Sequence, residues 1–155
     1  MLGQLQNRVP PPIVLGLVAV VMWGLSQFWG RQGQAWALWL ALALIGLAFA
    51  LMFPALRAFA VAQTTINPVR VTTATALVTG GVYRFSRNPM YLAMALILCA
   101  WALWLGSWLV WLGPLVFALW IDRMQIAPEE QALNVLFPAE FAAYRARVRR
   151  WVWAA

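Results

Sequence analysis

Two arginines and an asparagine stand directly before a long uncharged run, in the stretch VYRFSRNPMY at residues 82–91. Guanidinium groups bind a carboxylate or a phosphate through paired hydrogen bonds. Pro89 is expected to begin a helix, which would put Arg87 and Asn88 at its amino terminus, where free backbone N–H groups and the helix dipole favour an anion. These residues predict an anion-binding site. The competing interpretation is that arginines and tyrosines at a membrane edge set topology and contact lipid headgroups.

A pair of glutamates, Glu129 and Glu130, is the second group of residues that can do chemistry. The chain has only four acidic residues, and two of them are adjacent. Adjacent positions of a helix point about 100° apart, so the two carboxylates would serve different purposes. Acids at a plain helix start would account for one glutamate better than for both. A ligand with a carboxylate at one end and a cation or sugar diol at the other would use arginines and glutamates together, and S-adenosylmethionine is such a molecule.

The sequence excludes several other chemistries. It contains no histidine and a single cysteine, Cys99, inside an apolar run. Disulfides within the chain, histidine-based triads and zinc sites built on the usual cysteine and histidine ligands are therefore ruled out, and no metal site is expected. The net charge is +7, and all eleven basic residues are arginines. Because these arginines border apolar runs, they predict contacts with lipid headgroups or anionic ligands rather than with nucleic acid.

Composition predicts an all-α integral membrane protein with a single domain, residues 1–155. Of the 155 residues, 65% are hydrophobic and eleven are tryptophan, and the mean hydropathy is +0.77. The uncharged run 91–121 would form a helix of about 46 Å, too long for one span. Gly106 and Ser107 are expected to break it into a tight helical hairpin. Four transmembrane helices are therefore expected, at about 13–29, 36–56, 89–105 and 107–124.

The distribution of arginines favours four spans over three. With four spans, ten arginines share the side of both termini and Arg31 alone lies on the other side, whereas three spans would split them five against six. Since positive residues accumulate in cytoplasmic loops, both termini are expected in the cytoplasm, with the protein in a bacterial inner membrane. A signal peptide is the competing interpretation of residues 13–29. Trp23 and Phe28 fit an interfacial belt better, and no clear cleavage site follows.

The carboxyl-terminal tail, residues 126–155, is expected to form amphipathic cytoplasmic helices. Pro128, followed by acidic side chains, is typical of a helix start, and Pro138 is expected to begin another helix. Four apolar residues recur at steps of three and four: Phe141, Tyr144, Val148 and Trp151. With arginines on the other faces, this apolar stripe predicts a helix that lies on an anionic membrane surface.

The stretch from Thr65 to Trp151 resembles the isoprenylcysteine carboxyl methyltransferase and phospholipid methyltransferase superfamily of small membrane enzymes. The hallmark of that superfamily is Arg-His-Pro-x-Tyr-x-Gly, followed after a helical hairpin by Glu-Glu and an aromatic-rich tail. The chain matches this pattern at Arg87, Pro89, Tyr91, Glu129, Glu130, Phe137, Tyr144, Val148 and Trp151. It departs at Asn88, where many members have histidine, and at Ala93, where they have glycine. The sequence Asn-Pro-Met-Tyr resembles the version found in phosphatidylethanolamine N-methyltransferases.

The resemblance implies a pocket for S-adenosylmethionine at the start of the third span, with S-adenosylhomocysteine as the product. The implied cofactor-binding residues are Tyr83, Arg84, Arg87, Asn88, Pro89, Met90, Tyr91, Glu129 and Glu130. The candidate catalytic residues are Arg87, Asn88, Glu129 and Glu130. In a chain without histidine, a glutamate is the expected general base. Glu130 is expected to contact the cofactor, because it lies deeper in its helix.

The resemblance also implies a methyl acceptor that is a lipid or another membrane-soluble small molecule. A phospholipid amine such as phosphatidylethanolamine is favoured, with an isoprenylcysteine-like carboxylate or a thiol as the alternative. Two other interpretations of the chain stay open. Membrane sterol reductases are similar in their carboxyl-terminal half and bind NADPH, although this chain lacks most of what they contain. The last interpretation is a structural membrane protein without enzyme activity.

Overall fold

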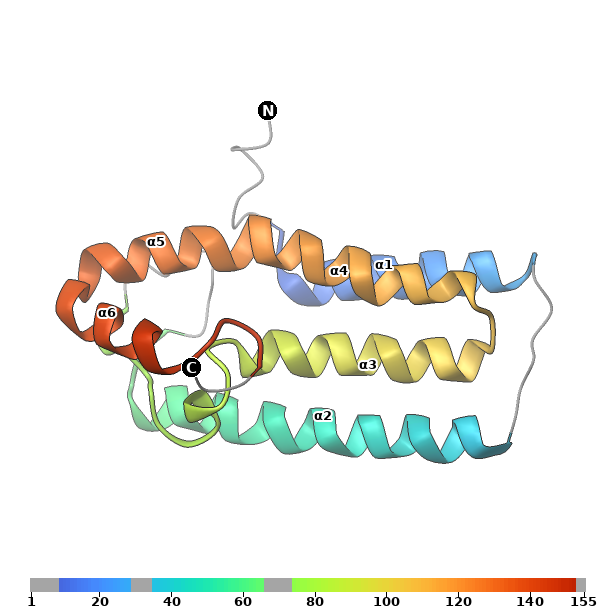
Figure 1. Ribbon diagram of the computed structural model, residues 1–155, viewed down its shortest axis with the longest axis horizontal. Coiled ribbons are helices and arrows are strands. Elements are labelled where there is room, and N and C mark those ends of the chain that lie inside the picture. The colour runs from blue at the N-terminus through green and yellow to red at the C-terminus, as the bar shows by residue number, and fades with distance from the viewer. Residues whose placement is uncertain (1–8, 29–34, 66–73, 153–155) are drawn as a thin grey trace.

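The chain folds into a bundle of helices, and the computed structural model describes residues 9–28, 35–65 and 74–152. Four helices, α1 (Pro11–Ser26), α2 (Ala35–Val61), α3 (Pro89–Leu105) and α4 (Leu112–Ile121), run side by side along the long axis (Figure 1). Helix α5 (Ala127–Leu136) continues the line of α4 beyond the bundle, and α6 (Pro138–Arg147) folds back under α5. Short 3-10 turns cover Gly81–Arg84 and Leu109–Trp111. No β-strand occurs in the described residues, which agrees with the predicted all-α fold.

Helix α3 is the centre of the bundle, because it packs against α2 and also contacts α1 and α4. Leu98, Phe117 and Ile121 are fully buried in this core. The outer faces of the helices are apolar but exposed, as Val20 at 65% and Trp39 at 72% illustrate. Apolar surface exposed on this scale is typical of a protein whose outer face contacts something other than water.

Two helical stretches are long and apolar enough to cross a membrane: Ala35–Val61 and Leu109–Leu136. Helices α1 and α3 are apolar but shorter. Each of the four predicted spans, at 13–29, 36–56, 89–105 and 107–124, overlaps one of the helices of the bundle, and residue 29 lies outside the described residues. Arg8, Arg31 and Arg70, which the topology prediction counts, lie outside the described residues.

Two glycines shape the ends and contacts of the apolar helices. Gly106 follows α3 with a φ of 64°, in the left-handed region that ends many helices, and its N–H donates to the carbonyl of Ala102. The predicted break of the run 91–121 at Gly106 is therefore confirmed. At Gly113 a Cβ atom would overlap the side chain of Met22, so a larger residue would require Met22 to change rotamer where α4 packs against α1.

Pro128 lies in the first turn of α5, as predicted, but α5 is not separated from the helix before it. The backbone stays helical from α4 into α5 through a π-helical turn, Asp122–Ile126, in which the N–H of Ala127 donates to the carbonyl of Asp122. Proline cannot donate to the carbonyl four residues earlier and would crowd it in a regular α-helix. A π turn widens the helix just before that point, so Pro128 is accommodated without a break. The glutamates that follow therefore belong to a helix continuous with the bundle.

The prediction that the tail stripe lies on the membrane is wrong. Phe141, Tyr144 and Val148 are buried, and they pack against Ala55 of α2 and against Tyr83. The hydroxyl of Tyr144 donates to the backbone carbonyl of Tyr83 at 2.7 Å. An amphipathic pattern shows that one face is covered but not what covers it. Here the end of the bundle covers the stripe, which brings the carboxyl-terminal segment back to the start of α3.

Replacing Tyr144 by phenylalanine is expected to lower the free energy of unfolding by about 1–3 kcal/mol, because the buried carbonyl of Tyr83 loses its donor. Tyr83→Phe is the matched control. The Tyr83 hydroxyl is buried and has no hydrogen-bond partner among the described residues, so its removal is expected to leave the unfolding temperature unchanged or to raise it. Thermal unfolding in detergent, without ligand, measures both variants. A larger loss for Tyr83→Phe than for Tyr144→Phe would contradict this account of how the tail is held.

Candidate functional site

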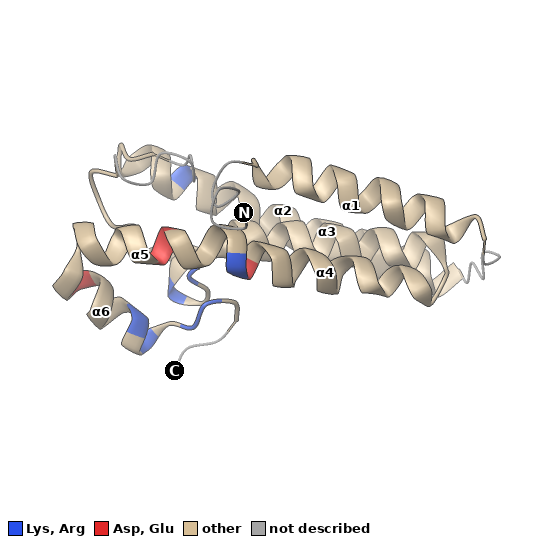
Figure 2. Ribbon diagram, turned by 90° about the horizontal axis from the view of Figure 1, so that it is seen from above, with Lys and Arg blue, Asp and Glu red and all other residues tan. Residues whose placement is uncertain are grey.

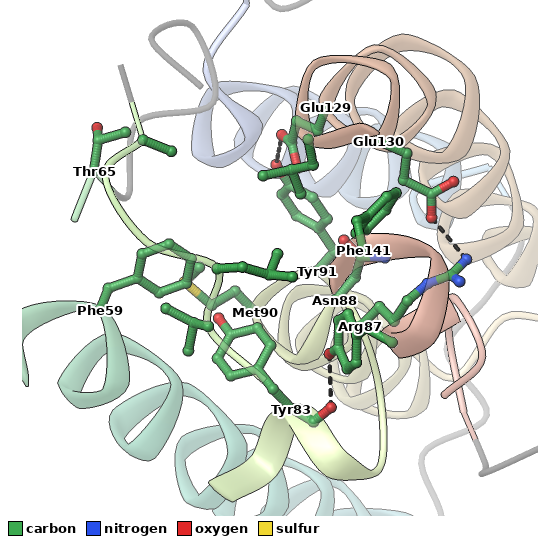
Figure 3. A pocket seen from close by; sticks show the side chains of 15 residues that line it. Phe59, Thr65, Tyr83, Arg87, Asn88, Met90, Tyr91, Glu129, Glu130 and Phe141 are labelled. Atoms are coloured by element: carbon green, nitrogen blue, oxygen red, sulfur yellow. Dashed lines mark hydrogen bonds and ion pairs between the residues drawn. The ribbon is translucent and has the colours of Figure 1, made fainter. Parts of the chain in front are cut away.

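A cavity of about 110 Å³ lies where α2, α3, α5 and α6 meet at one end of the bundle (Figure 3). Its wall combines residues that are far apart in the sequence, such as Phe59 of α2, Tyr91 of α3, Glu129 of α5 and Phe141 of α6. Figure 2 shows that the charged residues of the described chain gather at this end of the molecule. Most of the residues that line the cavity are apolar, and Glu129 and Glu130 add charged groups on the α5 side.

Four charged side chains form a continuous network beside the cavity. Glu130 accepts hydrogen bonds from Nη2 of Arg87 at 2.8 Å and from Nη2 of Arg150 at 2.6 Å. Arg150 also donates from Nη1 to both carboxylate oxygens of Asp122, at 3.0 and 3.1 Å. Two arginines and two acids make this network neutral, so each charge has an opposite charge next to it. The network joins α3, the π turn, α5 and the carboxyl-terminal segment.

Hydrogen bonds to backbone carbonyls hold the carboxyl-terminal segment across the start of α3. The N–H of Arg87 donates to the carbonyl of Arg149 at 3.1 Å, and Nδ2 of Asn88 donates to the carbonyl of Arg150 at 2.9 Å. Asn88 precedes the first residue of α3, yet its side chain makes no capping hydrogen bond to that helix. The asparagine that replaces the histidine of the superfamily pattern therefore ties the tail to the site.

Glu129 has a different environment from its neighbour Glu130. Its Oε1 accepts a hydrogen bond of 2.5 Å from the hydroxyl of Tyr91, and no arginine of the described chain lies within ion-pair distance. Glu129 lies beyond the apolar stretch that ends at Ile121. Burial raises the pKa of Glu129 to about 7, and the hydrogen bond from Tyr91 opposes that rise. A carboxyl group with such a pKa can exchange a proton near neutral pH.

Two donors at the cavity have no partner among the described residues: the hydroxyl of Tyr83 and Nε of Arg87. Burial raises the pKa of Tyr83 and lowers the pKa of Arg87, the latter against the attraction of Glu130. Unpaired buried donors cost free energy, which a ligand with acceptor atoms would recover. The two donors and the Glu129 carboxylate therefore give the cavity the means to bind a ligand with both anionic and cationic or hydroxyl groups.

Seven of the predicted site residues line this one cavity: Tyr83, Arg87, Asn88, Met90, Tyr91, Glu129 and Glu130. Pro89 is buried at the start of α3 but is not part of the wall, and Arg84 is exposed outside it. The sequence prediction missed the apolar part of the wall, which includes Phe59, Leu77, Val78 and Leu133. It also missed Asp122 and Arg150. Asp122 was the signal that could have been used, because an acid at the end of an apolar run requires a partner.

Comparison with known proteins places the chain in a family. The phospholipid methyltransferase family model matches residues 36–140, which is more than half of the chain and includes the stretch 82–91 and both glutamates. An uncharacterized protein of Haemophilus influenzae is 51% identical over 63 residues, which are 41% of this chain and the whole of that protein. No solved structure matches the chain. The range of the family match, together with the arginine and glutamates brought to one cavity, confirms the resemblance seen in the sequence, and the chain belongs to the phospholipid methyltransferase family.

Proposed function

We propose that the chain transfers a methyl group from S-adenosylmethionine to an amine on a membrane lipid, with phosphatidylethanolamine as the favoured acceptor. Family membership implies methyl transfer to a membrane-associated acceptor. The observation that carries the finer proposal is the pair of unlike groups in one cavity: Arg87, with an unpartnered Nε, and Glu129, a carboxyl group with no cation beside it. Methyl transfer to a lipid amine needs a site that binds the methyl donor and a group that accepts the proton of the amine. Arg87 can supply the first and Glu129 the second.

The unpartnered donors support S-adenosylmethionine as the methyl donor. When bound, it supplies a methyl group on a positively charged sulfur. Arg87 can hold a carboxylate through Nε, while its Nη2 stays with Glu130. The Tyr83 hydroxyl adds a second donor, and the rings of Phe59, Tyr83 and Phe141 can face a cation. The residues that are present therefore fit the cofactor in charge and in hydrogen-bonding capacity.

The size of the cavity sets a condition on this proposal. Pockets for small ligands usually enclose about 300–1,000 Å³. The cavity encloses about 110 Å³, so the ligand must widen it or extend through its mouth. Much of its wall is made of side chains that can change rotamer, such as Met90 and Leu133. The polar groups are held by hydrogen bonds, and the apolar wall is the part we expect to move.

Glu129 is the group proposed to take the proton of the acceptor. An amine that gains a methyl group must give up an N–H proton, and a carboxylate in contact with the acceptor can accept it. The expected role of Glu130 is different. Both of its oxygens are already held by guanidinium groups, so its effect on the cofactor would pass through Arg87 rather than through a direct contact. This modifies the sequence expectation that Glu130 touches the cofactor itself.

We also propose that all four bundle helices cross the membrane, with both termini and the cavity in the cytoplasm of a bacterial inner membrane. The two longer helices support two spans, and the apolar exposed faces of the bundle support the others. The charged residues gather at the cavity end (Figure 2). Since positive residues favour the cytoplasmic side, this end is the one expected to face the cytoplasm.

Reporter fusions test the topology. Fusions at either terminus are expected to report the cytoplasm, whereas one at Gly106 is expected to report the opposite side of the membrane, because Gly106 ends α3 away from the charged residues. As a control, the fusion in the hairpin is made with an uncharged linker, so that the fusion itself does not change the distribution of arginines. An exported carboxyl terminus would refute four spans and would put the cavity on the wrong side for a cytoplasmic cofactor.

Binding of S-adenosylhomocysteine tests the cofactor. Purified protein in detergent is expected to bind it with a micromolar Kd, which corresponds to about −8 kcal/mol. Arg87→Gln is expected to weaken binding by about tenfold or more, because it removes a charge-assisted contact. Arg147→Gln has the same charge change at an exposed position outside the cavity and should bind like the wild type. Calorimetry that detects NADPH but no S-adenosylhomocysteine would favour a reductase, and binding of neither would favour a structural protein.

The pH dependence of turnover tests Glu129. The base must be deprotonated to act, so turnover is expected to rise tenfold per pH unit below about 7, the pKa of Glu129, and to level off above it. Glu129→Gln should lose turnover and keep the affinity for S-adenosylhomocysteine. Tyr91→Phe removes a hydrogen bond that lowers this pKa, so the inflection should move to higher pH. An unchanged profile in Glu129→Gln would exclude Glu129 as the base.

A further inference from the structure

The outer half of the charge network contributes little to stability by itself. Arg150 and Asp122 have side chains that are 33% and 32% exposed. Partly exposed ion pairs usually contribute little to stability, because water screens them. The inner pair, Arg87 and Glu130, is only 11% and 12% exposed and lies at the cavity wall. The outer pair is therefore expected to act mainly through its effect on the geometry of the inner pair.

Arg150 fixes Glu130 in one orientation. Its Nε and Nη2 donate to the two different oxygens of Glu130, at 3.2 and 2.6 Å, which holds the plane of the carboxylate. Asp122 accepts two hydrogen bonds from Nη1 of the same guanidinium group and also one from Nε1 of Trp151 at 3.1 Å. Arg150 thus orients Glu130, and Asp122 orients Arg150.

Glu130 in turn decides where Arg87 points. An arginine side chain has many rotamers, and holding Nη2 at 2.8 Å from Oε1 of Glu130 selects among them. Nε of Arg87 is then left buried and without a partner among the described residues. An oriented donor binds a ligand without first losing conformational freedom, which raises affinity.

We infer that Arg150 and Asp122 are positioning residues of the cofactor site, which act through Glu130 to keep Arg87 oriented for its ligand. This inference rests on the proposed function, because it names the ligand as the anionic end of S-adenosylmethionine or S-adenosylhomocysteine. The carboxyl-terminal segment is also held by the backbone carbonyls of Arg149 and Arg150. A change of the Arg150 side chain therefore tests orientation of the site rather than docking of the segment.

The test is the affinity of full-length protein for S-adenosylhomocysteine, measured by calorimetry in detergent. Arg150→Gln is expected to weaken binding by about 10- to 100-fold, and Arg150→Lys, which keeps the charge but not the fork, by less. Asp122→Asn should weaken it by a few-fold. Arg147→Gln is the matched control, since Arg147 is an exposed tail arginine with no ion pair among the described residues, and it should bind within about twofold of wild type.

A double variant separates positioning from a general structural role. If Arg150 acts through Glu130, then Glu130→Gln with Arg150→Gln should bind no more than about threefold worse than Glu130→Gln alone. Effects that multiply in the double variant would overturn the inference, as would wild-type affinity in Arg150→Gln. If Arg150→Gln does not fold, Arg150→Lys and Asp122→Asn decide, and wild-type affinity in both overturns it. Absence of binding by the wild-type protein would instead refute the proposed function and this inference with it.

Discussion

The structure depends on one constraint: charges placed next to an apolar bundle must neutralise one another. Removing an ion from water costs several kcal/mol, and only close opposite charges and hydrogen bonds offset that cost. The chain has four acidic residues, and two of them, Asp122 and Glu130, are used to pair Arg87 and Arg150. The ion pairs that meet this requirement join the start of α3, the π turn, α5 and the last described residues. The cavity lies where these elements meet, so the elements that neutralise charge also form the site.

The π turn is what lets a single helix supply groups to both the bundle and the site. It lies where the uncharged α4 ends and the charged part of the helix begins. Gln125, within it, is fully buried and donates from Nε2 to the carbonyl of Val9 at 2.7 Å, which ties the segment before α1 to this point. π turns insert a residue into the helix and occur often at functional sites. Here the turn begins at Asp122, accommodates Pro128 and precedes the two glutamates.

Local signals explain which parts of the fold the sequence could predict. Pro89 and Gly106 bound α3 in the structure as they did in the prediction, because each acts through its own backbone. Pro128 marked the first turn of α5, but the continuity of α5 with α4 was not predictable, since whether a proline breaks a helix depends on the turn before it. The membrane-surface prediction for the stripe of Phe141 and Tyr144 was wrong because periodicity does not identify the surface that covers a stripe. The site residues of the 82–91 stretch and the two glutamates were predictable as a motif, whereas the pairing of Asp122 with Arg150, 28 positions later, is a tertiary contact that no local pattern contains.

The two adjacent glutamates show how different environments give two side chains of the same type different chemical roles. Glu130 lies between two guanidinium groups, which stabilise its charge and leave its oxygens occupied. Glu129, one residue earlier, faces Tyr91 and an apolar wall, and the same burial that makes its charge costly raises its pKa to about 7. A chain without histidine has no imidazole to exchange a proton near neutral pH, so this role is assigned to a carboxyl group. The network that fixes Glu130 also holds both arginines against Glu130 rather than Glu129. A guanidinium group beside Glu129 would lower its pKa again and make its carboxylate a weaker base.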